Sequence, residues 1–206
     1  MKNKNNYKNC LLLCSADHKV GAGHLIRSQI LAESLYKIGW KIILIGPNIN
    51  QNNIIKKKLF FRKILFKKTQ EGNFIKEINN RIFKIIKENS INLLVIDSYF
   101  IKNDFQNKIN KLFILKISNS KKNNSNCDLV LDYSFQKKNN KLDSSKFLIG
   151  PEYCLIQNKF NKTNKRNSKI ILITFGASNT LKQILETIKY IKLELPDYKI
   201  HVSTPS

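Results

Sequence analysis

Residues 17–28 read Asp17-His18-Lys19-Val20-Gly21-Ala22-Gly23-His24-Leu25-Ile26-Arg27-Ser28, and this stretch decides the fold because it separates a short apolar run from an amphipathic one. The run before it, Leu11 to Cys14, is apolar throughout and predicts a strand buried on both faces of a parallel sheet. After it, apolar residues recur at helical spacing from Leu25 to Ile38 and stop at Gly39, which suits a left-handed helix end. The stretch is therefore predicted to be a strand-to-helix turn.

Two glycines and a histidine carry the chemistry predicted for this turn. Gly21 and Gly23 allow a ligand to approach the main chain closely, because they lack a side chain. His24 falls at the start of the helix, where unpaired N–H groups and the helix dipole favour an anion or a developing negative charge. A neutral imidazole there can accept a proton from water. The alternative is that His24 only caps the helix, since Gly-x-Gly-His is short and lacks the third glycine of the dinucleotide fingerprint.

A second candidate segment is Asp97-Ser98-Tyr99, which follows a predicted strand at Ile91 to Ile96. In a parallel sheet its end lies at the same edge as the turn before His24, and ligands of open α/β sheets bind at that edge. Tyr99 and His24 are therefore expected to face one site. The alternative, equally open at this point, is that Asp97 caps the next helix and Tyr99 packs at the surface.

The rest of the chain predicts further strands and helices in alternation, which favours an α/β fold with a parallel sheet. The region from Asn48 to Thr69 does not distinguish strand from helix. Strands are expected at Trp40 to Ile45, Leu112 to Ile117, Cys127 to Asp132 and Phe147 to Ile149, and helices at Phe74 to Ile86 and Asp104 to Lys111.

The pattern restarts after Asn161 to Ser168, a polar run without an apolar residue that reads as a linker. A strand at Lys169 to Thr174, a helix at Thr180 to Leu193 and a strand at Lys199 to Val202 predict the opening of a second domain. A β-α-β unit of this size cannot bury a core of its own. The expected organisation is a domain over residues 1–160, a linker over 161–168 and the start of a second domain over 169–206.

The chain has 206 residues and a formal net charge of +23, which on its face favours a polyanionic partner. The excess is almost wholly lysine, however, because arginine occurs only at positions 27, 62, 81 and 166. Lys, Ile and Asn all have AT-rich codons, so genome composition explains the bias. Nucleic-acid readers use arginine and stacked aromatic residues, and neither is clustered here. No nucleic-acid partner is expected.

The four cysteines form no Cys-x-x-Cys pair, and the three histidines make no metal-binding spacing with them. Free, mostly buried thiols in a reducing cytoplasm are the simplest account. The N-terminus is polar, and the apolar run after it is too short to span a bilayer. The expected protein is soluble and cytoplasmic, with no metal, cofactor or membrane partner.

Five short motifs occur in a recognisable order, and together they resemble the UDP-sugar hydrolases of the pseudaminic acid pathway. These PseG-type enzymes are related to spore-coat polysaccharide proteins of the SpsG type and similar to the MurG-like glycosyltransferases. The resemblance runs from residue 11 to about 180. The motifs are Asp17 with Gly-Ala-Gly-His-Leu-Ile-Arg (21–27), Val-Ile-Asp-Ser-Tyr (95–99), Cys-Asp-Leu-Val-Leu-Asp (127–132), Ile-Gly-Pro-Glu-Tyr-Cys-Leu-Ile-Gln-Asn-Lys-Phe (149–160) and Ile-Thr-Phe-Gly-Ala-Ser-Asn (173–179).

The resemblance implies a GT-B architecture, with a Rossmann-like N-terminal domain followed by the first β-α-β of a second, incomplete Rossmann-like domain. The implied reaction is metal-independent hydrolysis of a UDP-linked 2,4-diacetamido-2,4,6-trideoxy-hexose to free sugar and UDP, with His24 as the general base that activates water. The residues implied to bind substrate are Asp17, Gly21, Ala22, Gly23, Arg27 and Tyr99, and those on the nucleotide side are Phe175, Gly176, Ala177 and Ser178.

Three departures from the family pattern stand out. The family's Asp-Asp after the fifth strand is replaced by residues 117–120, its Asp-Gln-Asn by Asp132-Tyr133-Ser134, and the second glycine of its Phe-Gly-Gly turn by Ala177. A family member also continues for roughly another hundred residues, a typical domain's length. A companion chain is one expected source of that remainder. The open alternatives are a hydrolase, a GT-B glycosyltransferase with a UDP-sugar donor, and a non-catalytic remnant or half of a split protein.

Overall fold

The computed structural model describes residues 8–14, 23–47, 57–66, 81–98, 112–118, 127–134, 146–156, 169–175 and 181–203. The chain divides into two compact units, one of Met1–Ser15 and His24–Ile156 and the other of Ala16–Gly23 and Gln157–Ser206, and each unit is considered by itself. The predicted linker Asn161–Ser168 lies outside the described residues. The predicted division into residues 1–160 and 169–206 therefore stays a prediction.

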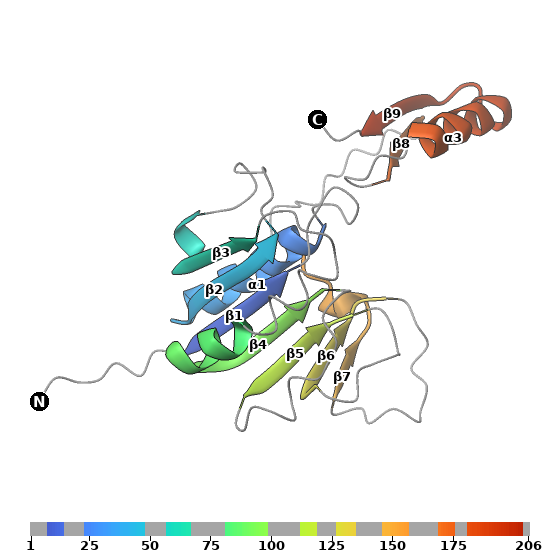
Figure 1. Ribbon diagram of the computed structural model, residues 1–206. Helices are drawn as coiled ribbons and strands as arrows, with labels where there is room; N and C mark the ends of the chain where they lie inside the picture. Colours follow the sequence, from blue (N-terminus) through green and yellow to red (C-terminus); the bar gives the residue numbers. More distant parts are fainter. Residues whose placement is uncertain are drawn as a thin grey trace, which may run out of the picture. The chain divides into compact units, whose positions relative to one another are not determined.

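The first unit is built on a seven-stranded sheet in the order β3-β2-β1-β4-β5-β6-β7, and every pair of neighbouring strands is parallel (Figure 1). The α/β class predicted from the alternating apolar runs is confirmed. The strands are β1 (Asn9–Cys14), β2 (Lys41–Pro47), β3 (Arg62–Phe66), β4 (Ile91–Asp97), β5 (Phe113–Ile117), β6 (Leu129–Asp132) and β7 (Phe147–Ile149).

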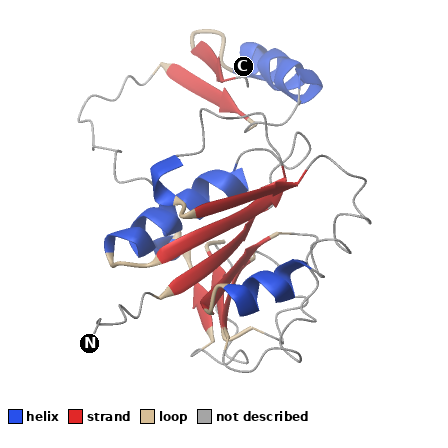
Figure 2. Cartoon of the chain, turned by 60° about the vertical axis from the view of Figure 1, so that its left-hand side comes forward, coloured by secondary structure: helices blue, strands red, loops and turns tan. Residues whose placement is uncertain are grey.

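Helices cover both faces of the central strands (Figure 2). Helix α1 (Gly23–Lys37) lies on one face, and the helical residues 81–88 lie on the other. Two short 3-10 helices add to these, η1 (Lys57–Leu59) and η3 (Pro151–Tyr153). In the part of the chain that the structure describes, no helix is long and apolar enough to cross a membrane.

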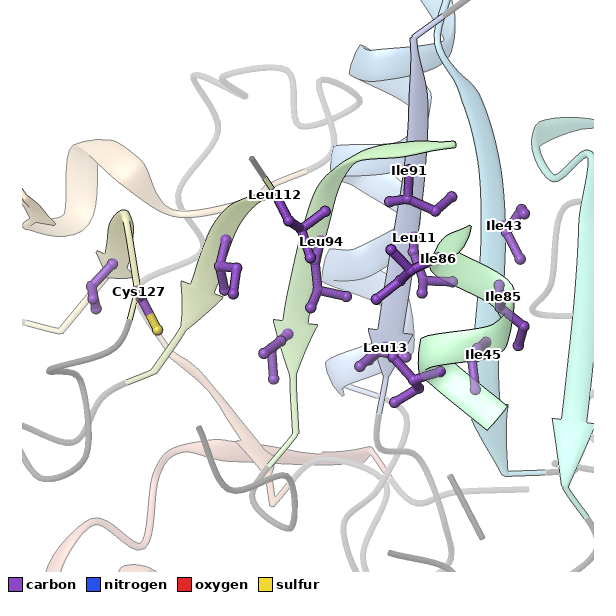
Figure 3. Close-up of a cluster of buried hydrophobic side chains, with 14 residues drawn as sticks. Leu11, Leu13, Ile43, Ile45, Ile85, Ile86, Ile91, Leu94, Leu112 and Cys127 are labelled. Carbon is purple, nitrogen blue, oxygen red and sulfur yellow. The ribbon is translucent and has the colours of Figure 1, made fainter. Parts of the chain in front are cut away.

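The main hydrophobic core combines buried side chains of residues 81–88 with those of five neighbouring strands, β2, β1, β4, β5 and β6 (Figure 3). Alternate residues of a strand point to opposite faces, so Leu11 and Leu13 of β1 enter this core while Leu12 and Cys14 face α1. Both sets are buried, which explains why β1 is apolar from Cys10 to Cys14.

Helix α1 ends as its sequence predicts. Gly39 has a φ of +87°, its N–H donates to the carbonyl oxygen of Tyr36, and the N–H of Trp40 donates to that of Leu35. These two bonds make a Schellman motif, which satisfies carbonyls at the helix end. The left-handed conformation that glycine permits at position 39 therefore ends the helix at this point.

The buried face of α1 differs from the apolar face that the sequence predicted. Ile38 is 72% exposed, whereas His24, Ser28 and Gln29 are buried. The reason is that the first turns of the helix lie beside polar atoms at the end of β4, so their buried positions require hydrogen-bonding side chains.

The other sequence predictions for the first unit hold with small shifts. Strand β2 runs two residues past its predicted end. Gly46 in this extension lies close to the backbone of β1, where an added Cβ would come within 3.1 Å of the Cys14 carbonyl oxygen. The region that the sequence left undecided contains η1 and β3. The helix predicted at Asp104 to Lys111 lies outside the described residues.

The second unit contains β8 (Ile170–Thr174), α3 (Leu181–Glu194) and β9 (Lys199–Ser203), with the two strands parallel. All three elements were predicted, but their burial was not. Apolar residues recur along α3 at helical spacing, but Leu181 and Leu185 are exposed, and only Ile184 of this helix is buried. Two strands offer too little surface to cover an apolar helix face.

Candidate functional site

The candidate site lies at the edge of the sheet where the parallel strands end. The chain runs through β1, β2 and β3 in one direction across the sheet, and through β4 to β7 in the other. Strands β1 and β4 are neighbours at this reversal, with Cys14 paired to Asp97. In open α/β sheets, ligands bind outside the carboxyl ends of the strands at this kind of switch point. His24, at the start of α1, reaches the same place.

Asp97 is the centre of the site. Its side chain is fully buried, and its two carboxylate oxygens accept hydrogen bonds from three side chains of α1. His24 Nδ1 is 2.6 Å from Oδ1, Arg27 Nη2 is 2.6 Å from Oδ1 and Arg27 Nε is 2.8 Å from Oδ2. Ser28 Oγ adds a longer contact of 3.4 Å to Oδ2. A buried carboxylate is tolerated only with such partners.

The contacts of His24 Nδ1 fit two tautomers of the ring. Nδ1 lies 2.6 Å from both Asp97 Oδ1 and Arg27 Nη2. An ionised carboxylate only accepts and a guanidinium only donates, so a protonated Nδ1 donates to Asp97, whereas an unprotonated Nδ1 accepts from Arg27. When Nδ1 donates, it shares Oδ1 with Arg27 Nη2, and the lone pair of the imidazole lies on Nε2. This is the tautomer that can act as a base toward a ligand.

The resulting unit is a base with an orienting carboxylate behind it. A histidine whose Nδ1–H is held by a carboxylate can accept a proton at Nε2, and the carboxylate stabilises the imidazolium that forms. Arg27 balances the charge of Asp97 through two parallel hydrogen bonds, the geometry for which a guanidinium is suited. The arrangement can therefore move one proton to and from a ligand at the edge of the sheet.

Arg27 is held on its far side as well. Its Nη1 donates a 2.9 Å hydrogen bond to the hydroxyl oxygen of Tyr133, which directly follows β6, and its Cζ lies 5.4 Å from the centroid of the Tyr133 ring. A cation at this distance from an aromatic face is attracted by the ring. The side chain of Arg27 is 17% exposed, so both contacts are shielded from most water.

Among the described residues, Cys14 is a further ionisable group beside Asp97. Burial and the neighbouring Asp97 carboxylate raise the pKa of its thiol to about 12, against smaller opposing effects of a hydrogen bond with Ser28 and of the Arg27 charge. The thiol is therefore neutral near pH 7. Since the thiolate is the reactive form of cysteine, Cys14 is not a nucleophile here.

The structure describes four of the residues that the sequence singled out for the site. His24 and Arg27 are brought together with Asp97, Gly23 is the exposed first residue of α1, and Phe175 is an exposed residue after β8. The remaining predicted residues lie outside the described part of the chain and stay predictions. They are Asp17, Gly21, Ala22, Tyr99, Gly176, Ala177 and Ser178.

Sequence reasoning missed three members of the cluster. Asp97 was placed at the correct edge of the sheet, but its partners were unknown and a capping role stayed open. Ser28 was noted only as a missing glycine, and Tyr133 only as a departure from a family pattern. A usable signal for Ser28 was its spacing of four residues from His24, which puts both on one face of a helix.

Metal binding finds no support in the described residues, where no three His, Cys, Asp or Glu side chains are grouped so that they could hold an ion. The cluster at Asp97 contains one histidine and one carboxylate, and the carboxylate oxygens are occupied by the donors of α1.

Comparison with known sequences gives one distant relative. No family model matches the chain. The uncharacterized protein MJ1062 of Methanocaldococcus jannaschii is 28% identical over 207 residues, covering 89% of this chain and 40% of that protein. The chain thus spans well under half the length of the curated relative that it matches.

Comparison with solved structures gives similar folds at low sequence identity. A glycosyltransferase from Rickettsia africae has a TM-score of 0.62 and 15% identity, covering 98% of this chain and 69% of its own. The glycotransferase of kitacinnamycin has a TM-score of 0.62 and 14% identity, covering 96% and 66%. MurG of Acinetobacter baumannii has a TM-score of 0.53 and 9% identity, covering 95% and 66%.

The fold of this chain is therefore that of the GT-B glycosyltransferases, whose Rossmann-like domains contain such parallel sheets. The GT-B architecture implied by the sequence resemblance is confirmed. At these identities the similarity establishes the fold alone, and function has to be argued from the site.

Proposed function

We propose that this protein is a sugar-nucleotide enzyme that hydrolyses a UDP-linked 2,4-diacetamido-2,4,6-trideoxy-hexose to the free sugar and UDP. The observation that carries the proposal is the buried contact between His24 and Asp97 at the switch point of the sheet, which provides a preorganised base. The five sequence motifs supply the substrate class, and the GT-B fold is compatible with it.

In the proposed reaction His24 accepts a proton from water while the water oxygen attacks the anomeric carbon of the sugar. The bond from that carbon to the UDP oxygen breaks, and its electron pair leaves with UDP. Asp97 keeps the imidazole oriented and stabilises its positive charge. Returning the proton from His24 to solvent completes the cycle. The chain's own residues carry these steps without a metal.

The test is release of UDP from this sugar nucleotide by the 206-residue chain and by His24→Gln. His201 on β9 is exposed, so His201→Gln is a matched control. Loss of a general base is expected to lower kcat by about a hundredfold or more. The control is expected to keep wild-type activity. Equal activity of His24→Gln and wild type would exclude His24 as the base.

A glycosyltransferase is the second candidate, and the solved structures with similar folds favour it. The same base would then deprotonate a hydroxyl of an acceptor instead of water. This enzyme would release little UDP from the donor alone, and release would rise when a suitable acceptor is added. The UDP assay with and without candidate sugar or lipid-linked acceptors separates the two reactions.

The second unit is proposed to be completed by further polypeptide, for which a companion chain is one source. Apolar side chains are exposed on one face of β8, at Ile170 and Leu172, and along α3, and such surfaces are normally covered by neighbouring strands and helices. In the resembled family this half approaches the nucleotide, here through Phe175, Gly176, Ala177 and Ser178. If the chain alone releases no UDP with any acceptor, a non-catalytic remnant or one half of a split enzyme becomes the leading reading.

A further inference from the structure

Arg27 is fixed at both of its edges, and only one of those edges belongs to the base described above. Nε and Nη2 donate to Asp97, while Nη1 donates to the Tyr133 hydroxyl at 2.9 Å. The Tyr133 ring adds a cation–π contact at 5.4 Å. Tyr133 therefore holds the Arg27 guanidinium through both a hydrogen bond and a cation–π contact.

The inner edge of Arg27 is coupled directly to His24. Arg27 Nη2 and His24 Nδ1 share Asp97 Oδ1, each at 2.6 Å, and they lie 2.6 Å from each other. Any rotation of the Arg27 guanidinium moves Nη2 relative to Asp97 Oδ1, and it therefore changes how well His24 Nδ1 can hydrogen-bond to that oxygen. The orientation of the imidazole thus depends on where Arg27 is held.

Arg27 needs an outer contact to keep that position. An arginine side chain has several rotatable bonds, and fixing them costs free energy that a single bidentate pair offsets only in part. Its 17% exposure also gives water and anions access to the guanidinium. Tyr133 follows directly on β6, two strands away from β4, so it anchors Arg27 to a part of the sheet that does not itself carry the base.

We propose that Tyr133 is a positioning residue, which acts through Arg27 and Asp97 to hold His24 in the Nδ1–H tautomer with its Nε2 ready to accept a proton. The catalytic consequence rests on the proposed function, whereas the effect on the imidazole does not. Tyr133 is also one of the two positions, with Ser134, at which this chain departs from the Asp-Gln-Asn pattern of the resembled family after β6.

The experiment compares Tyr133→Phe and Tyr133→Leu with Tyr36→Phe, a control on α1 whose side chain is 54% exposed. Tyr133→Phe removes the hydroxyl and keeps the ring, and Tyr133→Leu removes both. The first readout is 15N NMR of the histidine rings, with the His24 signals assigned by their loss in His24→Gln. Circular dichroism and Trp40 fluorescence verify that each variant is folded.

In the wild type we expect a predominantly Nδ1-protonated His24. Tyr133→Phe is expected to raise the Nε2–H form measurably, Tyr133→Leu to raise it further, and Tyr36→Phe to leave it unchanged. In the UDP assay, Tyr133→Phe is expected to lower kcat by about tenfold with KM nearly unchanged, the range seen when orienting partners are removed.

The two proposals fail in different ways. If the His24 signals of folded Tyr133→Phe and Tyr133→Leu match those of wild type, the positioning role is wrong, whatever the activity. If those signals change as expected but neither wild type nor any variant turns over the sugar nucleotide, the positioning role stands and the proposed reaction is wrong. Should Tyr133→Leu fail to fold, Tyr133→Phe decides, because it keeps the ring and its volume.

Discussion

The two units each open with a strand followed in the chain by a helix, but the first unit buries the apolar residues of its strand and the second leaves many of them exposed. In β1 the residues Leu11, Leu12 and Leu13 are at most 1% exposed, whereas Leu172 of β8 is 66% exposed. The runs Leu-Leu-Leu and Ile-Ile-Leu-Ile differ little in hydrophobicity. The difference arises because β1 has strands on both sides and helices on both faces, while β8 has one strand and one helix. The burial of an apolar strand is therefore decided by the strands and helices that pack around it.

Helices α1 and α3 also differ in the kind of side chain that they bury. Helix α1 buries polar side chains, among them His24 and Ser28, and α3 exposes apolar ones such as Leu185. A helix with a regular apolar face contributes mainly to packing. A helix that buries hydrogen-bonded polar groups at a strand end departs from that pattern, and such departures are expected at functional sites. Helix α1 therefore belongs to the site, whereas the apolar face of α3 is largely uncovered within its own unit.

The largest difference in stability between the two units is expected when the buried carboxylate of Asp97 is removed. Asp97→Ala is expected to lower the free energy of unfolding by about 3 to 5 kcal/mol, because it leaves Arg27 partly buried without its counter-charge. Asp197, exposed after α3, is the matched position, and Asp197→Ala is expected to change stability by less than about 0.5 kcal/mol. Denaturant unfolding followed by the single tryptophan, Trp40 of the first unit, measures the first effect, and circular dichroism covers both. A loss under about 1 kcal/mol for Asp97→Ala would mean that water replaces the carboxylate.

A comparison of two leucines tests the packing itself. Leu94→Ala in β4 is expected to cost about 3 kcal/mol, because the side chain is fully buried in the main core. Leu185→Ala in α3 is expected to cost less than about 0.5 kcal/mol, since half of its surface is already exposed. Both are measured as shifts in thermal unfolding by circular dichroism. A cost at Leu185 that grows with protein concentration would instead indicate that α3 is covered by a second copy in solution.

A smaller effect, of opposite sign, is expected at Lys116 of β5. Burial lowers the pKa of its amine from the ordinary value of 10.5, while the nearby Cys127 thiol acts in the raising direction. The unfolded state therefore holds this proton more tightly, so the penalty is present below the lowered pKa of Lys116 and is relieved as the pH rises toward 10.5. Lys116→Met is expected to stabilise the protein by about 1 kcal/mol at pH 7. The gain should shrink at pH 10, and an equal gain at both values would contradict a charge penalty.

Much of the fold was predictable from local patterns, and the exceptions share a cause. Strands such as β4 and β5 and the end of α1 at Gly39 follow from apolar runs and from glycine geometry, which are local properties. The burial of His24 and the exposure of Leu185 were not predictable, because each depends on what lies opposite in space. The same holds for the site: His24 and Arg27 were identified, but not the carboxylate that joins them.

The sequence by itself determined an α/β chain with parallel strands, a helix beginning at a Gly-x-Gly-His turn, and a histidine at its start. These features depend on residues close together along the chain, whose torsions and spacing act over a few positions. Only the tertiary structure decided that Asp97 lies 2.6 Å from His24 and that Tyr133 holds Arg27 from two strands away. Hydrogen bonds between residues some 70 and 106 positions apart arise from the order in which strands pair, and that order is set by the whole sheet.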